Sequence, residues 1–166
     1  MSKIKHVLFL CSGNVCRSIA AEYYAKWLKD TSYKDKLKEV NFDSAGIRHY
    51  FEKPHEGTLR YLNSKGISTD GITPKDITEE MINNQDLILA FEEKYHIRRL
   101  KRKFKHIDKL DEKIHLLLEF AGETEDLEIK DPFYMDETEY NKIISKIEEA
   151  INKSVEKIFE INKIED

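Results

Sequence analysis

Both cysteines of the chain fall in one segment, Cys11-Ser12-Gly13-Asn14-Val15-Cys16-Arg17-Ser18. A cysteine thiolate is a strong nucleophile, and the planar guanidinium of an arginine can hold two oxygens of a tetrahedral dianion. Gly13 and Asn14 tolerate positive φ, which lets successive backbone N–H groups turn toward a common point. The segment is therefore predicted to be a phosphate-binding loop in which Cys11 attacks phosphorus and Arg17 holds the phosphate oxygens.

The residues on either side of this loop predict the elements that would position it. Residues 4–10 form a short apolar run of the kind found in buried strands. Residues 18–30 carry apolar side chains at helical spacing. The positive end of that helix dipole would face the loop. Together with the backbone N–H donors and Arg17, it would favour the thiolate form of Cys11.

The rest of the chain alternates predicted strands with predicted helices. Strands are expected at residues 40–44, 86–91 and 113–120, and helices at residues 57–64 and 92–103. An apolar stripe over residues 143–158 predicts a long C-terminal helix, with Asp136 and Glu139 placed for a capping box. The alternation predicts an α/β fold, a three-layer α/β/α sandwich around a four-stranded parallel sheet. Ligands in such folds bind beyond the carboxyl ends of the strands, where the loop lies.

Composition limits the function further. The chain has 166 residues, of which 40% are hydrophobic and 36% charged, and its net charge is −4. The length predicts a single domain over residues 1–166, and the slightly acidic balance argues against a general nucleic-acid-binding surface. Two cysteines are too few for a disulfide framework or a four-cysteine zinc site. No metal-ligand cluster or cofactor motif is visible, so we expect neither a metal nor a cofactor.

The sequence also gives an expectation for location. No apolar run approaches the roughly 18 residues that are needed to span a membrane. The apolar part of residues 1–10 is too short for a signal peptide. We therefore expect a cytoplasmic protein with no membrane partner, in which reducing conditions keep both thiols free.

Three segments resemble the low-molecular-weight protein tyrosine phosphatase family, namely VLFLCSGNVCRS at residues 7–18, FDSAG at residues 42–46 and DPFY at residues 131–134. Element order and length are also similar, so the resemblance covers essentially the whole chain. It implies that Cys11 forms a phosphocysteine while Arg17 and the loop N–H groups hold the phosphoryl oxygens. It implies that Asp131 protonates the leaving phenolate and then activates the water that hydrolyses the intermediate.

The resemblance also implies supporting roles. Ser18 would donate a hydrogen bond to the Cys11 sulfur, and we expect it to cap the helix as well. Asn14 would hold the loop in shape, with Ser44 as its partner; a simple turn at the end of the strand is the alternative for Ser44. Cys16 is either a buried thiol that packs the loop or a residue that pairs with Cys11 under oxidation and protects it.

A pocket for phosphotyrosine needs depth and aromatic walls. Tyr50, Phe133 and Tyr134 are the candidates, because the family places its specificity loop and its late aromatics at matching positions. Exposed aromatics in loops can also be ordinary packing residues. If these aromatic residues form the walls of the pocket, the expected partners are phosphotyrosine-containing proteins or peptides.

Three departures from the family pattern concern the surroundings of the loop. Ile19 stands where the family usually has proline, which costs some rigidity at the start of the helix. Glu92 stands where an aspartate is common, and its longer side chain could meet a loop residue or Arg17. Residues 68–75 lack the histidine that some members use to brace the loop asparagine.

Other functions compete with this one. Protein arginine phosphatases share the fold but carry threonine at the position of Val15, whose methyl groups suit an aromatic ring better than a guanidinium-linked phosphate. Thioredoxin-linked arsenate reductases need further cysteines, and none follows Cys16. A non-catalytic phosphate-binding module would need neither the thiol nor Asp131. The basic run over residues 98–105 is expected to be a solvated helix face, although it could attract acidic phosphoprotein substrates.

Overall fold

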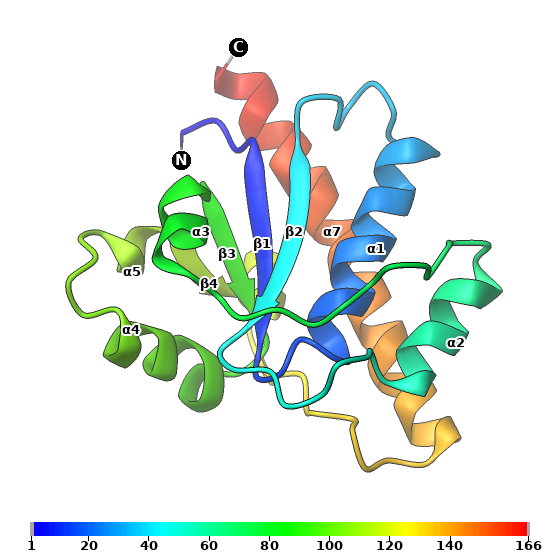
Figure 1. The fold of residues 1–166 in the computed structure, drawn as a ribbon. Coiled ribbons are helices and arrows are strands. Elements are labelled where there is room, and N and C mark those ends of the chain that lie inside the picture. Colours follow the sequence, from blue (N-terminus) through cyan, green and yellow to red (C-terminus); the bar gives the residue numbers. More distant parts are fainter. Residues whose placement is uncertain (1, 166) are drawn as a thin grey trace.

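A parallel sheet crosses the centre of the protein, which we describe over residues 2–165 of a computed structural model (Figure 1). Its strands are β1 (His6–Cys11), β2 (Asn41–Gly46), β3 (Leu87–Ala90) and β4 (Ile114–Leu116). They pair in the order β2-β1-β3-β4, and every pair is parallel. The predicted α/β fold with a four-stranded parallel sheet is confirmed.

Helices cover both faces of the sheet. They are α1 (Arg17–Asp30), α2 (Glu56–Ser64), α3 (Glu79–Asn84), the π-helix η1 (Glu93–Arg98), α4 (Arg99–Lys103), α5 (Leu110–Lys113), α6 (Leu117–Phe120) and α7 (Glu137–Glu165). Apolar residues of α1, α6 and α7 share one core cluster, and those of α3, η1, α4 and α5 share the other. The molecule therefore has the three layers that the sequence predicts.

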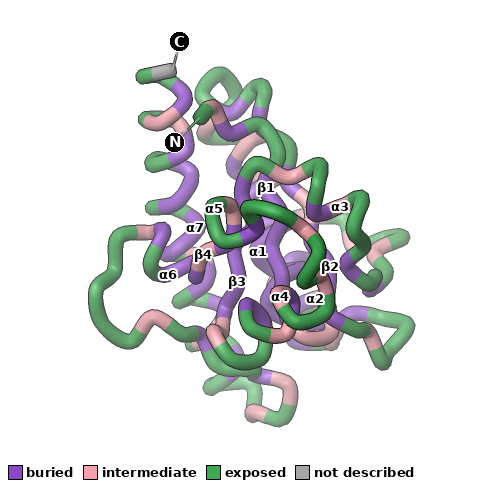
Figure 2. The backbone as a smooth tube through the Cα atoms, turned by 90° about the vertical axis from the view of Figure 1, so that its left-hand side faces the viewer, coloured by how far each residue is buried: buried purple, intermediate pink, exposed green. Residues whose placement is uncertain are grey.

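The alternation of side chains along β1 explains why both faces are covered. Val7 and Phe9 belong to the core cluster under α1 and α7, whereas Leu8 and Leu10 belong to the cluster under η1 and α4. All four are buried. A strand that is apolar on both faces is stable only between two layers, and Figure 2 shows the strands as buried tube, surrounded by helices with both buried and exposed stretches.

The long C-terminal helix forms as predicted. Asp136 Oδ1 accepts a hydrogen bond from the backbone N–H of Glu139 at 2.9 Å and so caps the start of α7. Ile144, Ile147 and Ile151 of the predicted stripe are buried against the sheet and α1. This stripe holds α7 beside α1, the helix that follows the loop.

The prediction of a strand over residues 113–120 is wrong in its second half. Only Ile114–Leu116 is strand, and Leu117–Phe120 is the short helix α6. Leu116 pairs with Ala90, which is the last residue of β3, so a longer β4 would have no partner for its backbone hydrogen bonds. The apolar side chains of α6 are buried against α7 instead. The short helices α3 and α5 were not predicted either.

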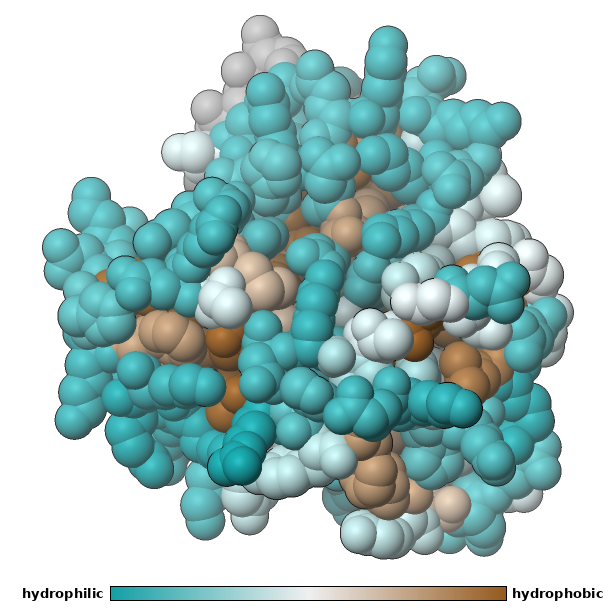
Figure 3. Space-filling view, in the orientation of Figure 1, coloured by the Kyte–Doolittle hydropathy of each residue, from teal (hydrophilic) through white to brown (hydrophobic). Residues whose placement is uncertain are grey.

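The surface is mainly hydrophilic. Figure 3 shows apolar side chains only as small separate patches on this face, as the high proportion of charged residues predicts. Among the helices of residues 2–165, none combines the length and the apolar character that a membrane span requires.

Candidate active site

The predicted loop links the carboxyl end of β1 to the start of α1 and curls back on itself. The carbonyl oxygens of Cys11 and Ser12 accept hydrogen bonds from the N–H groups of Ile47 and Arg48, both at 3.0 Å, and that of Val15 accepts from His55 at 2.9 Å. In a trans peptide the N–H points opposite to the carbonyl, so the next N–H groups face the other side. This is the direction that an anion-binding nest requires.

Backbone conformation in the loop differs in one respect from expectation. Asn14 has a φ of 56°, whereas Gly13 is not among the described residues with positive φ. The left-handed turn therefore rests on Asn14 alone. Asparagine tolerates this conformation because its short polar side chain can form local hydrogen bonds.

The loop lies directly on Gly46, the last residue of β2. A Cβ atom at Gly46 would be 2.8 Å from the backbone N of Asn14 and from the carbonyl carbon of Gly13, and 2.9 Å from the Ser12 carbonyl oxygen. Real Cβ atoms do not approach backbone so closely. The absence of a side chain at Gly46 therefore allows the loop backbone to pack directly against the end of β2.

The side chain of Asn14 holds the loop from inside. Its Nδ2 donates to Ser18 Oγ at 2.7 Å and to Ser44 Oγ at 2.9 Å, which is the Asn14–Ser44 contact that the resemblance implies. Its Oδ1 accepts from the backbone N–H of Lys75 at 3.0 Å, so a backbone group braces the asparagine in the segment without histidine. Ser44 Oγ in turn donates a hydrogen bond to Oε1 of the buried Glu22 side chain at 2.6 Å. Glu22 was not predicted.

Cys11 Sγ lies 2.9 Å from Ser18 Oγ, and both atoms are buried. Since Ser18 Oγ already accepts from Asn14, its hydroxyl proton is free to donate to the sulfur. Ser18 does not cap α1, contrary to our expectation. The N-cap is Cys16, which has no side-chain cap hydrogen bond, while Ser18 lies inside the first turn and its hydroxyl contacts Cys11 and Asn14.

Arg17 is buried beneath the loop with only 2% of its surface exposed. Its Nη1 donates to Glu92 Oε2 at 2.7 Å and to the carbonyl oxygen of Ile129 at 2.8 Å, so Glu92 meets Arg17 as one of its two predicted contacts. Its Nε is buried and makes no hydrogen bond with any residue in the described range 2–165. An unpaired buried donor is costly, and an anion in the nest would satisfy it.

His96 also lies under the loop, and no sequence pattern marked it. Its Nδ1 accepts from the backbone N–H groups of Phe91 and Glu92 at 3.2 and 3.0 Å, so the ring proton is on Nε2. Nε2 lies 3.1 Å from Ser12 Oγ and donates to it. Burial, with Arg17 and Arg99 nearby, lowers the pKa of His96 to about 2, so the ring is neutral.

Asp131 is exposed and follows a segment that is tied to the loop. The carbonyl oxygen of Ile129 binds Arg17, and its N–H donates to the Phe91 carbonyl at 3.0 Å. Asp131 Oδ1 accepts from the N–H of Phe133 at 3.1 Å. The carboxylate is close enough to Cys16 and Tyr140 to help raise the pKa of each.

The three predicted wall residues lie differently from one another. A cavity of about 440 Å³ beside the loop is lined by Val15, Phe51, Glu52, Lys53, Pro54, His55, Glu56 and Phe133. Phe133 stacks on Phe51 with ring centroids 5.1 Å apart. Tyr50 and Tyr134 are 68% and 95% exposed and do not line this cavity. Phe51, the neighbour of Tyr50 in the same segment, lines this cavity and was not singled out from the sequence.

Cys16 is buried and has the properties of a protonated thiol rather than those of a reactive thiolate. Burial raises its pKa to about 12, and it hydrogen-bonds the hydroxyl of Tyr140. Its backbone carbonyl accepts from Thr58 Oγ1 at 3.0 Å. Both Cys11 and Cys16 are free thiols here.

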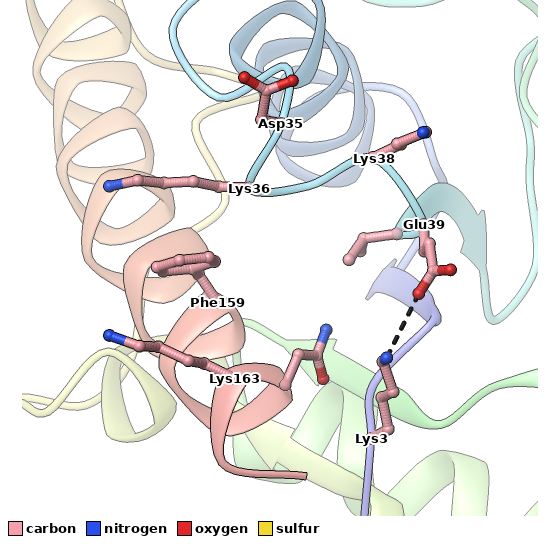
Figure 4. A pocket seen from close by; sticks show the side chains of 9 residues that line it. Lys3, Asp35, Lys36, Lys38, Glu39, Phe159 and Lys163 are labelled. Carbon is pink, nitrogen blue, oxygen red and sulfur yellow. Dashed lines mark ion pairs between the residues drawn. The ribbon is translucent and has the colours of Figure 1, made fainter. Parts of the chain in front are cut away.

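Other polar regions lack such an arrangement. Figure 4 shows a cavity of about 380 Å³ at the amino ends of β1 and β2, where Lys3 pairs with Glu39 at 3.3 Å among other charged side chains. The basic run over residues 98–105 lies on the surface, where Arg98 pairs with Glu93 and Lys101 with Asp111. Within residues 2–165, no three His, Cys, Asp or Glu side chains are grouped to hold a metal ion.

Comparison with known proteins gives a consistent result. Residues 6–163 match the family described as low molecular weight phosphotyrosine protein phosphatase. Low molecular weight protein-tyrosine-phosphatase YfkJ of Bacillus subtilis is 34% identical over 132 residues, covering 77% of this chain and 80% of its own. Low molecular weight protein-tyrosine-phosphatase PtpA of Staphylococcus aureus (strain MRSA252) is 30% identical, covering 88% and 91%.

Solved structures agree with the sequence matches. The crystal structure of YfkJ from Bacillus subtilis superimposes with a TM-score of 0.80 at 28% identity, covering 95% of this chain and 96% of that one. The YwlE arginine phosphatase from Geobacillus stearothermophilus superimposes with a TM-score of 0.75 at 23% identity, covering 92% of each chain. The second likeness is one of fold.

Proposed function

Because the chain belongs to the low molecular weight phosphotyrosine protein phosphatase family, we propose that it hydrolyses phosphotyrosine and small aryl phosphates through a phosphocysteine intermediate. Its relatives are named as protein-tyrosine-phosphatases, which makes the chain a phosphoric monoester hydrolase.

In the first step, the Cys11 thiolate attacks phosphorus from the floor of the loop. The P–S bond forms as the P–O bond to the phenol breaks, and Asp131 gives its proton to the departing oxygen. Arg17 and the loop N–H groups hold the three remaining oxygens as their charge redistributes.

In the second step, the Asp131 carboxylate takes a proton from a water molecule as the water oxygen attacks phosphorus. The P–S bond breaks, and the sulfur leaves as a thiolate that the Ser18 hydroxyl stabilises at 2.9 Å. Inorganic phosphate is released, and both Cys11 and Asp131 return to their starting states.

The observation that carries this proposal is the state of Arg17. One nitrogen of its guanidinium, Nη1, is held by Glu92 and by a backbone carbonyl, while Nε is buried without a partner among residues 2–165. A guanidinium oriented in this way is preorganised to receive phosphate oxygens without further rearrangement.

The test compares p-nitrophenyl phosphate hydrolysis by the wild type, Cys11→Ser and Asp131→Asn. We expect turnover to be lost in Cys11→Ser, because an alcohol in the same place is a far weaker nucleophile. We expect turnover to fall about 100-fold or more in Asp131→Asn, because the amide can neither protonate the leaving group nor take a proton from the water that attacks the phosphocysteine. Full activity in Cys11→Ser would contradict the mechanism.

Arginine phosphate is the second candidate substrate, since an arginine phosphatase shares the fold. Val15 favours tyrosine, because its methyl groups line the cavity beside Phe51 and Phe133 and offer no hydroxyl to a guanidinium. Phosphotyrosine and phosphoarginine should be assayed side by side. If kcat/KM is higher for phosphoarginine than for phosphotyrosine, the proposed substrate is phosphoarginine instead. We place the reaction in the cytoplasm, where a reactive thiolate stays reduced.

A further inference from the structure

His55 connects three segments of the candidate site. Its backbone N–H donates to the Val15 carbonyl of the loop at 2.9 Å. Its Nδ1 accepts the N–H of Gly57 at 3.0 Å and so caps α2. Its Nε2 lies 3.0 Å from the carbonyl oxygen of Phe133, two residues after Asp131.

These contacts fix the proton of the imidazole. Since Nδ1 accepts an N–H, the proton of the neutral ring is on Nε2, which therefore donates to the Phe133 carbonyl. Two aromatic contacts hold the ring in place, since it stacks on Tyr140 with centroids 4.8 Å apart and meets Phe133 edge-on at 5.0 Å. Tyr140 has room to pack there because Gly57 lacks a Cβ, which would otherwise lie 2.5 Å from the Tyr140 ring.

A single residue, Phe133, links His55 to Asp131 by hydrogen bonds. Phe133 accepts from His55 through its carbonyl and donates its N–H to Asp131 Oδ1 at 3.1 Å. Upstream, the Ile129 carbonyl is held by Arg17. The segment that carries Asp131 is therefore tied on both sides, once to Arg17 beneath the loop and once to His55 at its rim.

We propose that His55 is a positioning residue that keeps the carboxyl group of Asp131 directed at the leaving-group oxygen. This inference rests on the proposed function and adds to it a residue that acts on Asp131 through Phe133 rather than on the reacting atoms. General acid catalysis depends steeply on geometry, since a proton donor must lie within hydrogen-bond reach of its acceptor. Loss of the His55 contact should therefore weaken the protonation step selectively.

Two substitutions separate the two ring nitrogens. His55→Asn keeps an acceptor near the position of Nδ1, and so the cap of α2, but does not reach Phe133. His55→Gln keeps a donor near the position of Nε2 but loses the cap. His115→Asn is the matched control, because His115 also lies beside a backbone carbonyl, that of Glu112 at 3.3 Å, but in β4.

The measurement is kcat/KM for phenyl phosphate, whose leaving group needs the proton, against that for p-nitrophenyl phosphate, whose leaving group needs it much less. In His55→Asn we expect kcat/KM to fall about tenfold for phenyl phosphate and less than twofold for p-nitrophenyl phosphate. His55→Gln should lose a few degrees of Tm yet keep a ratio near that of the wild type. In an Asp131→Asn background, His55→Asn should change the ratio no further.

The inference is overturned if His55→Asn retains the wild-type ratio, if His115→Asn shifts the ratio as much, or if His55→Asn acts equally with and without Asp131. Different results would contradict the proposed function itself. The wild type would then hydrolyse neither aryl phosphate, or Cys11→Ser would remain fully active.

Discussion

Glu92 Oε2 accepts a hydrogen bond from Arg17 Nη1 at 2.7 Å across 75 residues of sequence. The pair is nearly enclosed, with Arg17 almost fully buried and the Glu92 side chain 18% exposed. Glu92 and the Ile129 carbonyl both accept hydrogen bonds from Nη1, and Nε has no hydrogen-bond partner among residues 2–165. The orientation of Arg17 therefore depends on an acid at the end of β3, a strand beside β1.

We predict that Glu92→Ala lowers kcat/KM for p-nitrophenyl phosphate by about 10- to 100-fold, because a charge-assisted hydrogen bond contributes about 1.5–3 kcal/mol. Glu92→Gln keeps an oxygen that can accept from Nη1 and should lose less. Steady-state kinetics of both variants gives the comparison. Equal activity in Glu92→Ala and the wild type would show that Arg17 holds its orientation without Glu92.

We predict that Gly46→Ala inactivates the enzyme, because its methyl group would press against the backbone of Asn14, Gly13 and Ser12 at 2.8–2.9 Å. Gly122→Ala is the matched control. Gly122 has a φ of 101° and nothing within 4 Å of a Cβ, so alanine there costs backbone strain but does not touch the loop. Both variants should melt earlier in a thermal scan, but only Gly46→Ala should lose turnover. Normal activity in Gly46→Ala would mean that the loop tolerates displacement.

His96 should make the fold sensitive to acid. Its folded-state pKa is lowered to about 2 by burial, against about 6.5 in an unfolded chain, so below pH 6.5 the unfolded state binds a proton that the folded state does not. Stability therefore falls as the pH falls below about 6.5, by roughly 2 kcal/mol at pH 5 from this group alone. Urea unfolding at pH 5 and pH 7 measures the difference. It should shrink in His96→Asn, which keeps an acceptor for the N–H groups of Phe91 and Glu92, and an unchanged difference would exclude His96 as its source.

The two cysteines should react differently with an alkylating agent. The pKa of Cys16 is raised to about 12 by burial, so this side chain is a protonated thiol at neutral pH and a poor nucleophile. We expect iodoacetamide to modify the folded protein once, at Cys11, and inorganic phosphate to slow that reaction by filling the loop. Peptide mass spectrometry locates the modified residue, and labelling of Cys16 in native protein would refute the assignment. Cys11→Ser should remain unlabelled.

The loop could be predicted from the sequence because its parts are contiguous. Cys11, Asn14, Arg17 and Ser18 lie in one run between a buried strand and a helix, and a local pattern of this kind does not depend on the rest of the chain. The parallel sheet could be predicted for a similar reason, since each apolar strand is a local run and helices separate the strands. The short helix at residues 117–120 could not be predicted in this way. Whether an apolar run continues as a strand or becomes a helix depends on the length of the strand it would pair with.

Only the tertiary structure decided what surrounds the loop. Ser18 looks like a helix cap in the sequence, but Cys11 and Asn14 take up its hydroxyl. His96 and His55 carry no pattern, since each acquires its role from groups that lie far away in the chain, Ser12 in one case and Phe133 in the other. The parallel order β2-β1-β3-β4 gathers the carboxyl ends of the strands at one edge. The local sequence was thus enough to predict the phosphate-binding loop, and the folded chain determined which distant side chains lie around it.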